Sequence, residues 1–475
     1  MLDGNGIGQL SDVLAAIDWV IYHAREYNIR VMNLSLAADS TETWQTDPLA
    51  RASRAAVAAG ITVVVAGGNF GKDSLGRERF GTISSPGHDP SVITVGAVNT
   101  RGTNVRGDDI VNAFSSRGPT RGSFVDGNGV RRIDNLIKPD LVAPGNKIVG
   151  ALASDKAGAG GSWNRLAVTY GALSSPYGGA KQASNQTLMN LSGTSIAAPA
   201  VAGAVALMLQ ANPGLTPPLV KAILQYSAQP IAGANLLQQG AGLLNVDGAV
   251  KMAQALRTDI ASAIEAGTLI AGANLLASGK TLPAPGTTAN GQTFGWSRIV
   301  FGGGRQILSG PALFTQYQPI WDPRLVWGGP AARRSTVSYW PAASGVPANT
   351  FVKSIVEAAA PNQTLIGPSV VSATALAGSS SQLGRTGAYI PTATLSGWLA
   401  SGSGIILSEG IILSEGIILS EGIILSEGII LSEGIILSEG IILSEGIILS
   451  EGIILSESGQ TGVSSADDSS LLGEP

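Results

Sequence analysis

The sequence contains no cysteine and only two histidines, His23 and His88, in 475 residues. Without cysteine the chain has neither a disulfide framework nor a thiolate metal site, although this does not fix its cellular compartment. Any mechanism that needs a histidine base has to use one of these two imidazoles. We expect no metal and no cofactor.

Charge and long apolar runs are also scarce. Charged residues make up 13% of the chain, the formal net charge is −4, and no basic segment stands out, so we expect no nucleic-acid partner. No uninterrupted apolar run reaches the roughly 18 residues that a membrane span needs. The N-terminal residues 1–6 lack the features of a signal peptide. We treat that as uninformative, because we expect the chain to begin inside a longer protein.

Glycine is abundant, and residues 10–100 alternate between helical and strand patterns. Apolar residues at helical spacing predict a helix over residues 10–25, with Ser11 as its N-cap. The other elements predicted here are a strand over 30–36, a helix over 49–59 closed by Gly60, and strands over 61–66 and 91–98. The strands over 61–66 and 91–98 are almost wholly apolar, as in a parallel sheet buried on both faces. The pattern predicts a three-layer α/β domain.

Later segments differ in composition. Small apolar residues predict a helix over 197–210, ended by Pro213, and a second helix over 218–228. Residues 258–403 are rich in Ala, Gly, Ser, Thr and Pro and favour a β-rich or loosely structured module. We therefore predict domains over 1–257 and 258–403, a repeat region over 404–457 and a disordered tail over 458–475.

Residues 404–457 are nine copies of Gly-Ile-Ile-Leu-Ser-Glu. Because a period of six is a multiple of two, each position keeps its face in an extended chain. We favour a β-solenoid with ladders of like residues over a meander, which would swap faces at each turn. The alternative is a low-complexity tract that aggregates or orders only with a partner, with the glutamates as gatekeepers. We expect self-association through the repeats.

The chemistry-bearing segment is Leu191–Pro199, which places Ser195 at the head of an apolar helix and after Gly193. Glycine admits a close substrate backbone, and the unpaired amides of a helix N-terminus favour a developing oxyanion. Taken alone, Gly-Thr-Ser before a helix is usually an N-cap.

The longer string resembles the serine motif of the subtilisin-like serine peptidases, or subtilases, with Ile196 where that family usually has methionine. Other segments resemble the family in the same order: Val31–Leu36, Val64–Gly71, Ser85–Val98, Phe114–Pro119, Lys138–Gly145 and Asn212–Ala228. The resemblance covers residues 1–257 and implies an incomplete subtilisin-like three-layer fold with a mostly parallel sheet. Residues 239–250 and the hexapeptides resemble large multi-module bacterial subtilases more narrowly.

The resemblance implies roles for particular residues. Ser195 is the nucleophile, and Asn69 is a side-chain donor to the tetrahedral intermediate, although Gly-Asn is also ordinary turn chemistry. The substrate-binding residues implied are Ser35, Leu36, Ala37, Ala66, Gly67, Gly68 and Gly193. Ala37 stands where the family usually has glycine, which would narrow the entrance of the S1 pocket. Calcium sites are common in the family, yet no loop here matches one.

A serine nucleophile needs a base and an acid to orient that base. In subtilases both precede the helix predicted here at residue 10, and the printed sequence has no His-Gly-Thr-His motif. Asp3 is rejected as the acid because residues 11–19 resemble the segment that follows the family's histidine. The position of His23 is that of a solvated helix residue, and the position of His88 is that of a turn residue. Asp89 is adjacent to His88 in the sequence, and adjacent residues in a turn rarely form a catalytic pair. In a subtilisin, loss of the histidine costs about 10⁶ in turnover.

These observations leave two functions open. The first is a secreted serine endopeptidase that acts on polypeptides. In this case the chain lacks the catalytic aspartate and histidine of the enzyme and is inactive by itself. The second is a non-catalytic surface or adhesive protein that presents the repeats on a subtilase scaffold. An unrelated hydrolase fits poorly, because residues 193–197 do not form the Gly-x-Ser-x-Gly elbow. Secretion or a cell-surface location follows from the resemblance alone.

Overall fold

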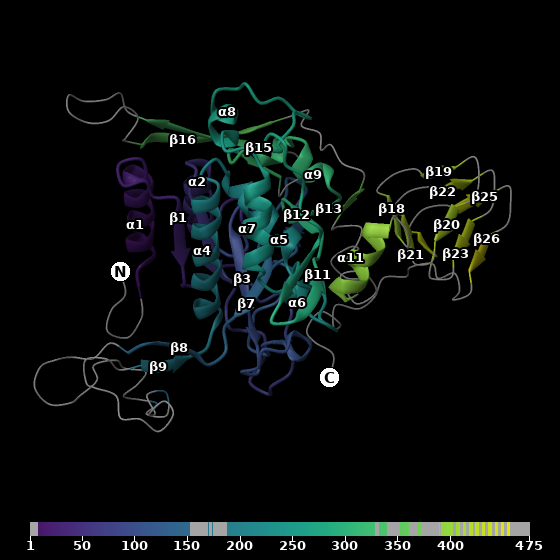
Figure 1. The fold of residues 1–475 in the computed structure, drawn as a ribbon, viewed down its shortest axis with the longest axis horizontal. Helices are drawn as coiled ribbons and strands as arrows, with labels where there is room; N and C mark the ends of the chain where they lie inside the picture. The colour runs from purple at the N-terminus through teal and green to yellow at the C-terminus, as the bar shows by residue number, and fades with distance from the viewer. Residues whose placement is uncertain are drawn as a thin grey trace, which may run out of the picture.

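The computed structural model describes residues 8–152, 188–327, 332–339, 352–360, 369–372 and 391–401, with residues 170, 173 and 389 and nine short strands between 405 and 456. Its centre is a five-stranded sheet. The strands are β1 (Val31–Leu34), β2 (Thr62–Ala66), β3 (Ile93–Asn99), β4 (Ile110–Val111) and β7 (Leu141–Pro144). Strands β1, β2, β3 and β7 run parallel, and β4 pairs antiparallel with the end of β3 (Figure 1).

Helices cover both faces of the sheet. On one face lie α1 (Leu10–His23) and α2 (Pro48–Ala58), and on the other lie α4 (Thr194–Ala211), α5 (Pro217–Ser227) and α7 (Val246–Ala255). Strand β2 shows why both faces are apolar: Val63 and Val65 belong to the first layer's core, and Val64 and Ala66 to the second. Side chains alternate between faces along a strand, so a strand buried on both sides is almost wholly apolar, with Thr62 as the one polar residue of β2. The predicted α/β domain is confirmed.

Helix α2 agrees with the sequence to within one residue at each end, whereas α4 begins at Thr194, three residues before its predicted start, and α1 lacks its predicted cap. Helix α2 begins after Asp47, whose carboxylate accepts a hydrogen bond from the Ala50 N–H at 2.8 Å, and it is followed by Gly60 at φ +90°. Helix α1 is different, because its N-cap is Gln9 and no side chain caps it. The prediction of Ser11 as the N-cap is therefore wrong, since the apolar spacing that begins at Leu10 starts the helix earlier.

Helix α4 is the central helix of the domain. It has 18 residues with a mean hydropathy of 1.6, so by length and composition it meets the requirement for a membrane span. Its buried residues, which include Val201, Val205 and Met208, belong to the same apolar cluster as β2 and β3. In this fold its apolar character serves the packing against the sheet.

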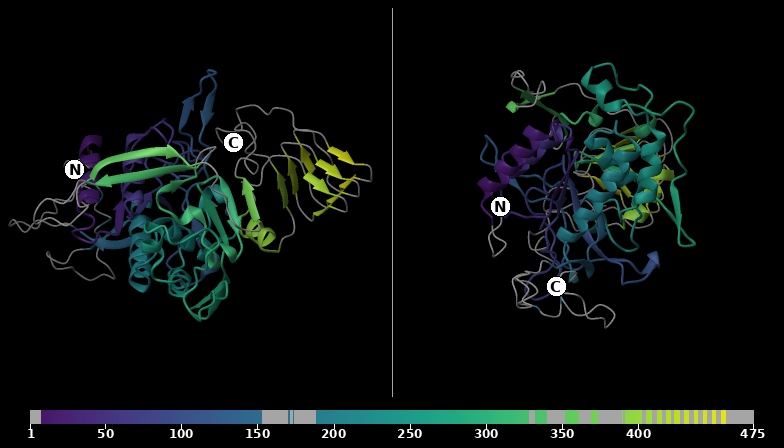
Figure 2. Two further views of the ribbon diagram at one scale, coloured as in Figure 1. Left: turned by 90° about the horizontal axis from the view of Figure 1, so that it is seen from above. Right: turned by 60° about the vertical axis from the view of Figure 1, so that its left-hand side comes forward.

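Residues beyond 257 add helices and small antiparallel sheets. The strands are β10 (Gly286–Ala289), β11 (Gln292–Gly295), β12 (Ile299–Gly302), β13 (Gln306–Ser309), β14 (Leu325–Val326), β15 (Arg333–Tyr339), β16 (Val352–Ala359) and β17 (Ser369–Ser372). The helices are α8 (Ile260–Glu265), α9 (Ala312–Thr315), the 3₁₀ turn η4 (Pro319–Trp321) and α11 (Thr392–Ser401). The long β15–β16 hairpin extends over the α2 side of the molecule (Figure 2). Glu357 of β16 accepts a hydrogen bond from Arg54 of α2 at 2.6 Å.

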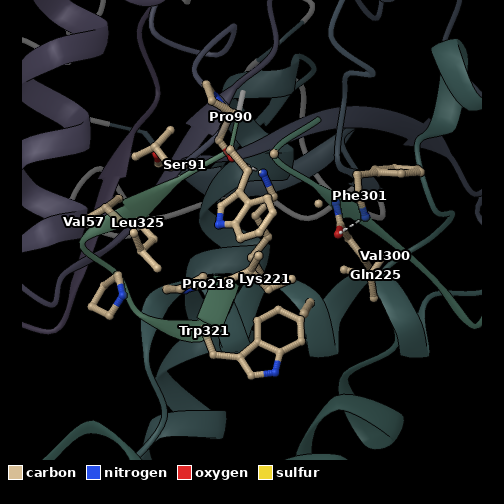
Figure 3. A pocket seen from close by; sticks show the side chains of 17 residues that line it. Val57, Pro90, Ser91, Pro218, Lys221, Gln225, Val300, Phe301, Trp321 and Leu325 are labelled. Atoms are coloured by element: carbon tan, nitrogen blue, oxygen red, sulfur yellow. Dashed lines mark hydrogen bonds between the residues drawn. The ribbon is translucent and has the colours of Figure 1, made fainter. Parts of the chain in front are cut away.

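One apolar core continues across residue 257. The cluster around α4 and α5 includes Trp296, Val300, Phe314 and Trp321 from the later residues. The seam between the two parts also holds a small cavity of about 50 Å³, and Figure 3 shows Lys221 and Gln225 of α5 there with Pro90, Phe301, Trp321 and Leu325. The two parts are thus packed as one body, while the division into domains at residue 257 stays a prediction.

The repeats form short strands that pair in parallel at a spacing of 18 residues, such as Ile405 with Ile423 and Ile424 with Ile442. The strands are β18 (Ile405–Ser408), β19 (Ile412–Ser414), β20 (Ile418–Ser420), β21 (Ile423–Ser426), β22 (Ile430–Ser432), β23 (Ile436–Ser438), β24 (Ile442–Ser444), β25 (Ile448–Ser450) and β26 (Ile454–Ser456). Like residues lie opposite each other in every pair. The tail over 458–475 lies outside the described residues.

The remaining elements are short. They are η1 (Arg106–Asp108), β5 (Ser123–Val125), β6 (Arg131–Ile133), β8 (Ile148–Ala151), β9 (Leu188–Leu191) and α6 (Leu236–Gln239). Strands β8 and β9 pair antiparallel and lead into the head of α4. That connection positions the candidate nucleophile.

Candidate active site

Ser195 is the second residue of α4, and the N-cap of that helix is Gly193. In this first turn the Thr194 N–H donates to Asn69 at 2.9 Å and the Ile196 N–H to the Gly193 carbonyl at 3.0 Å, whereas the Ser195 N–H has no acceptor among the described residues. Gly193 has φ +150°, and a Cβ at this position would lie 3.3 Å from Asn69 Nδ2. Its N–H donates to the Gly145 carbonyl at 2.8 Å. Only glycine fits this entry to the helix without strain or crowding.

Asn69 lies just after β2 and faces the head of α4. Its Oδ1 accepts hydrogen bonds from the Thr194 N–H at 2.9 Å and the Thr194 hydroxyl at 3.1 Å. Because a backbone N–H can only donate, the atom that faces it has to be the carbonyl oxygen of the carboxamide. The Nδ2 group therefore points elsewhere, and no acceptor for it occurs among the described residues. The carboxamide is thus held in place with a free donor.

Gly67 and Gly68 join β2 to Asn69 with every backbone polar group occupied. The Gly67 N–H donates to Val95 at 2.9 Å, and its carbonyl accepts from Ser84 at 3.1 Å. The Gly68 N–H donates to the Thr194 hydroxyl at 3.1 Å, and its carbonyl accepts from Ser116 at 2.9 Å. With buried Ala66, these residues are able to form a wall of the site, but they keep no backbone hydrogen bond for a substrate.

Residues 35–37 have the opposite property. Ser35 leaves the end of β1 and its hydroxyl donates to the Ser195 carbonyl at 2.7 Å, which ties β1 to the first turn of α4. Within the described chain, no backbone hydrogen bond joins Leu36 or Ala37 to another residue. Pairing with the rest of the fold resumes at Ala38, which exchanges two hydrogen bonds with Ser85 at 2.9 and 3.1 Å. Leu36 and Ala37 therefore offer free backbone groups beside Ser195.

Neither imidazole is hydrogen-bonded to Ser195, whose hydroxyl has no partner in the part of the chain that the structure describes. His23 Nδ1 pairs with Glu26 Oε2 at 2.7 Å at the end of α1. His88 is buried, with burial lowering its pKa, and its Nε2 has no partner among the described residues. The neighbouring Asp89 pairs with Arg54 and accepts from the Ser91 N–H at 2.7 Å. Among the described residues, no group of three or more metal-ligating side chains lies close enough to hold an ion.

The profile of the subtilase family matches residues 1–250, which is more than half of the chain. The chain belongs to the subtilase family. It is 35% identical over 255 residues to serine protease AprX of Bacillus subtilis (strain 168), covering 53% of this chain and 50% of that protein. It is 31% identical over 251 residues to subtilisin amylosacchariticus of Bacillus subtilis subsp. amylosacchariticus, covering 53% and 48%. The solved structure of sphericase aligns with TM-score 0.37 and 23% identity over 52% of this chain and 67% of that one.

This subtilase chain spans about half the length of the curated relatives that it matches. The family membership inferred from the ordered motifs is confirmed. The roles of the individual residues are a separate question, which these comparisons leave open.

Sequence reasoning missed the side chains that hold the site together. Thr194 anchors both Asn69 and Gly68, and Asn33 donates to the Ser35 hydroxyl at 2.9 Å. A signal for Asn33 was present, because residues 33 and 35 share one face of an extended strand. No comparable signal pointed to Thr194, since its partners lie more than a hundred residues away in the sequence.

Behind the sheet, the motif at residues 138–140 forms a buried ionic cluster. Asp140 accepts from Lys138 and from Lys221, each at 2.8 Å, and from the Gln225 side chain at 2.9 Å. Burial lowers the pKa of Lys138 to about 7. Burial alone would raise the pKa of Asp140, but the two ammonium groups outweigh it and hold that pKa below its usual range. The cluster joins β7 to α5 and lies apart from Ser195.

Proposed function

We propose that the complete protein is a serine endopeptidase that cleaves polypeptides through an acyl-enzyme on Ser195. The observation that carries the proposal is the anchored carboxamide of Asn69, which turns its Oδ1 to Thr194 and leaves Nδ2 free beside Gly193. A turn asparagine has no need of such an anchor across more than a hundred residues of sequence. A donor that stabilises a developing charge does, because it has to be positioned before the reaction.

The chemistry follows from the groups at the head of α4. The Ser195 hydroxyl attacks the scissile carbonyl, and the oxyanion formed is stabilised by Asn69 Nδ2 and by the Ser195 N–H. The substrate backbone pairs with the free groups of Leu36 and Ala37, while Ala66, Gly67 and Gly68 form the opposite wall. Gly193 allows the scissile peptide to approach. Collapse of the intermediate expels the amine, which takes up the proton that left the Ser195 hydroxyl, and leaves the acyl group on Ser195. Water then hydrolyses this ester and frees a peptide with a C-terminal carboxylate.

The attack requires an imidazole to take the hydroxyl proton and a carboxylate to orient that imidazole. Since neither His23 nor His88 is hydrogen-bonded to Ser195, we infer that both groups are encoded ahead of the residues in this chain. The chain by itself should then have no practical turnover. Secretion, or display at the cell surface, is the corresponding expectation for where the complete enzyme acts.

A second candidate is a non-catalytic surface or adhesive protein on the same scaffold. The observation that favours it is the Ser195 hydroxyl without a partner in the described chain. In this case the repeats would carry the function, folded as a β-solenoid of 18-residue coils through which copies associate. The division into a subtilase domain, a module over 258–403 and the repeats belongs to the same set of proposals.

The test joins the chain to the coding sequence found in frame upstream of its first codon. If the first candidate is right, that sequence encodes an aspartate motif and a His-Gly-Thr-His motif, and the extended protein is labelled by an active-serine phosphonate. Ser195→Ala should abolish the labelling. Ser192→Ala is the matched control, because Ser192 is exposed on the same turn and should leave the labelling intact. Labelling that persists in Ser195→Ala, or a stop codon in place of the motifs, rejects the endopeptidase proposal.

Asn69→Ala in the extended protein tests the oxyanion role separately. Turnover should fall by about 10² to 10³ with little change in KM, a magnitude known for loss of one such donor in a subtilisin. An unchanged turnover would show that Asn69 takes no part in the mechanism. It would not bear on the proposal that Ser195 is the nucleophile.

A further inference from the structure

A cleft of about 400 Å³ lies at the end of the molecule away from Ser195. Its wall includes Leu215 and Pro217, which follow the C-terminal end of α4, while Ser195 lies at the other end of that 18-residue helix. At 1.5 Å per residue the two ends are about 27 Å apart. The volume is within the range of sites that bind small molecules or short peptides. The cleft is therefore separate from the candidate active site.

The cleft is built where the early and late parts of the chain meet. Apolar side chains make up much of its wall: Ala24, Ile29, Ala59, Leu215, Ile264 and Pro323. Three arginines, Arg25, Arg30 and Arg324, also line it, with Glu265 as the acidic residue on the wall. The cleft thus combines an apolar interior with an excess of positive charge.

Arg30 is the group that points to a ligand. It is half-buried just before β1, and its guanidinium donates to the carbonyls of Pro213 and Leu215, each at 3.1 Å. Among the described residues no carboxylate forms an ion pair with it, and burial lowers its pKa. A guanidinium has five N–H donors, so two carbonyl partners leave donors unused. A partly desolvated cation without a counter-ion is costly unless an anion joins it.

The other two arginines have acidic partners. Arg324 makes a two-pronged pair with Asp322, at 2.8 and 2.9 Å. Arg25 pairs with Glu265 at 3.5 Å, and both side chains are exposed. Such an exposed pair is weak and is readily exchanged for a better partner. Arg30 and Arg25 are therefore the two cations able to engage a bound anion.

We propose that this cleft binds a short apolar peptide through its free C-terminal carboxylate. Arginine holds a planar carboxylate with two parallel hydrogen bonds, and the apolar wall accommodates the side chains next to it. We assign the carboxylate to a peptide because the proposed endopeptidase releases peptides that end in a free carboxylate. This choice of ligand rests on the proposed function. Binding itself needs neither Ser195 nor an imidazole.

The experiment measures equilibrium binding to the full chain by isothermal titration calorimetry. The probes are the peptide N-acetyl-Ala-Leu-Val with a free carboxylate, the same peptide as its C-terminal amide, and inorganic phosphate. The acid should bind about tenfold or more tightly than the amide, the scale of a charge-assisted hydrogen bond. Phosphate should bind more weakly than the acid, because it does not contact the apolar wall. Equal binding of acid and amide, equal binding of phosphate and acid, or no binding at all overturns the inference.

Two variants with opposite expected effects on the affinity for the acid test whether the peptide binds in this cleft. Arg30→Gln should reduce binding of the acid to the level of the amide, and Arg131→Gln, an exposed arginine of β6, should change nothing. Glu265→Gln should tighten binding of the acid severalfold, because it removes the negative charge that competes with the ligand for Arg25. Glu265 is 74% exposed, so this variant tests the cleft even if Arg30→Gln does not fold. Failure of both variants to alter binding excludes this cleft, whatever the phosphonate labelling shows about Ser195.

Discussion

At the scale of single residues, the candidate site depends on backbone conformations that few residue types adopt. Gly193, at φ +150°, precedes Thr194 in the chain, and Gly68, at φ +108°, precedes Asn69, so the two glycines flank the contact between Thr194 and Asn69. A Cβ on Gly68 would come within 2.7 Å of the Ser84 hydroxyl and 2.8 Å of the Ser116 hydroxyl. Both positions therefore need glycine for conformation and for space.

Gly193→Ala tests this requirement. The substitution should lower the free energy of unfolding by about 1 to 3 kcal/mol, because it places a side chain in a strained conformation against Asn69. Gly203→Ala is the matched control in the same helix, where no atom lies within 4 Å of the new Cβ. It should stabilise the protein by about 0.5 to 1 kcal/mol. Urea denaturation of both variants measures the two changes, and the same sign for both would refute the conformational argument.

Asp134 is a second residue with a measurable signature. Its carboxylate accepts from the Thr43 hydroxyl at 2.6 Å and the Trp44 N–H at 3.0 Å, yet burial raises its pKa to about 6. The folded protein therefore binds a proton more tightly than the unfolded chain between about pH 4 and pH 6.

The free energy of unfolding should consequently fall as the pH rises through that window, by up to about 3 kcal/mol from this group. Asp134→Asn should remove this part of the pH dependence. Thermal unfolding of both proteins from pH 4 to pH 7 measures it, with the difference between the two profiles as the readout. Parallel profiles would mean that the pKa of Asp134 is not raised.

At the scale of elements, strand β7 and helix α5 are joined by buried charges as well as by apolar contacts. Asp140 of the segment leading into β7 is fully buried between Lys138 and Lys221. Among the described residues, Asp140 is the carboxylate that forms an ion pair with each of the two lysines. Loss of the Asp140 carboxylate should lower the free energy of unfolding more than loss of one lysine, because Asp140 and the remaining lysine still form a balanced pair.

Asp140→Asn should destabilise the protein by about 3 to 5 kcal/mol, because it removes the carboxylate that pairs with both lysines and leaves each of them either charged without that partner or deprotonated. Lys138→Met should cost only about 1 to 2 kcal/mol, since Asp140 keeps Lys221 and the loss is limited to the hydrogen bonds that Lys138 makes with Asp140, Val92 and Thr94. Chemical denaturation ranks the two variants. Equal losses would show that the cluster does not act as a charge-balanced unit.

At the scale of the whole molecule, the subtilase domain and the residues beyond 257 share a core. Phe314 is fully buried, contacts Tyr226 of α5 at a ring separation of 4.9 Å and stacks on Trp321 at 6.1 Å. Arg54 and Glu357 add an ionic contact on the other face of the sheet. We therefore expect the central sheet and the later residues to unfold together.

Phe314→Ala should lower the free energy of unfolding by about 3 to 5 kcal/mol, the cost of a large cavity in a packed core. It should also speed hydrogen exchange at the amides of β2 and β3, which lie in the other part of the chain. Ile270→Ala is the control, because Ile270 is 71% exposed and its loss should change stability by less than about 0.5 kcal/mol. If hydrogen exchange in β2 and β3 is unchanged, the central sheet and the residues beyond 257 do not unfold together.

The elements were the most predictable level, for a physical reason. Strand β2 is apolar after Thr62 because both of its faces are buried, and α4 is interrupted by no charge because it packs at the centre. Such patterns are local and can be read directly from the sequence. The N-cap of α1 was missed because Gln9 lacks the short polar side chain that marks a cap.

The sequence by itself determined the layered α/β domain, the family and the identity of Ser195 and Asn69 as candidates, because these depend on periodicity and short motifs. Only the tertiary structure decided how Thr194 orients Asn69, that one core crosses residue 257, and that Arg30 lines a cleft without a counter-ion among the described residues. Each of these is a contact between segments far apart in the chain. No local pattern encodes such a contact, since it arises when the layers pack.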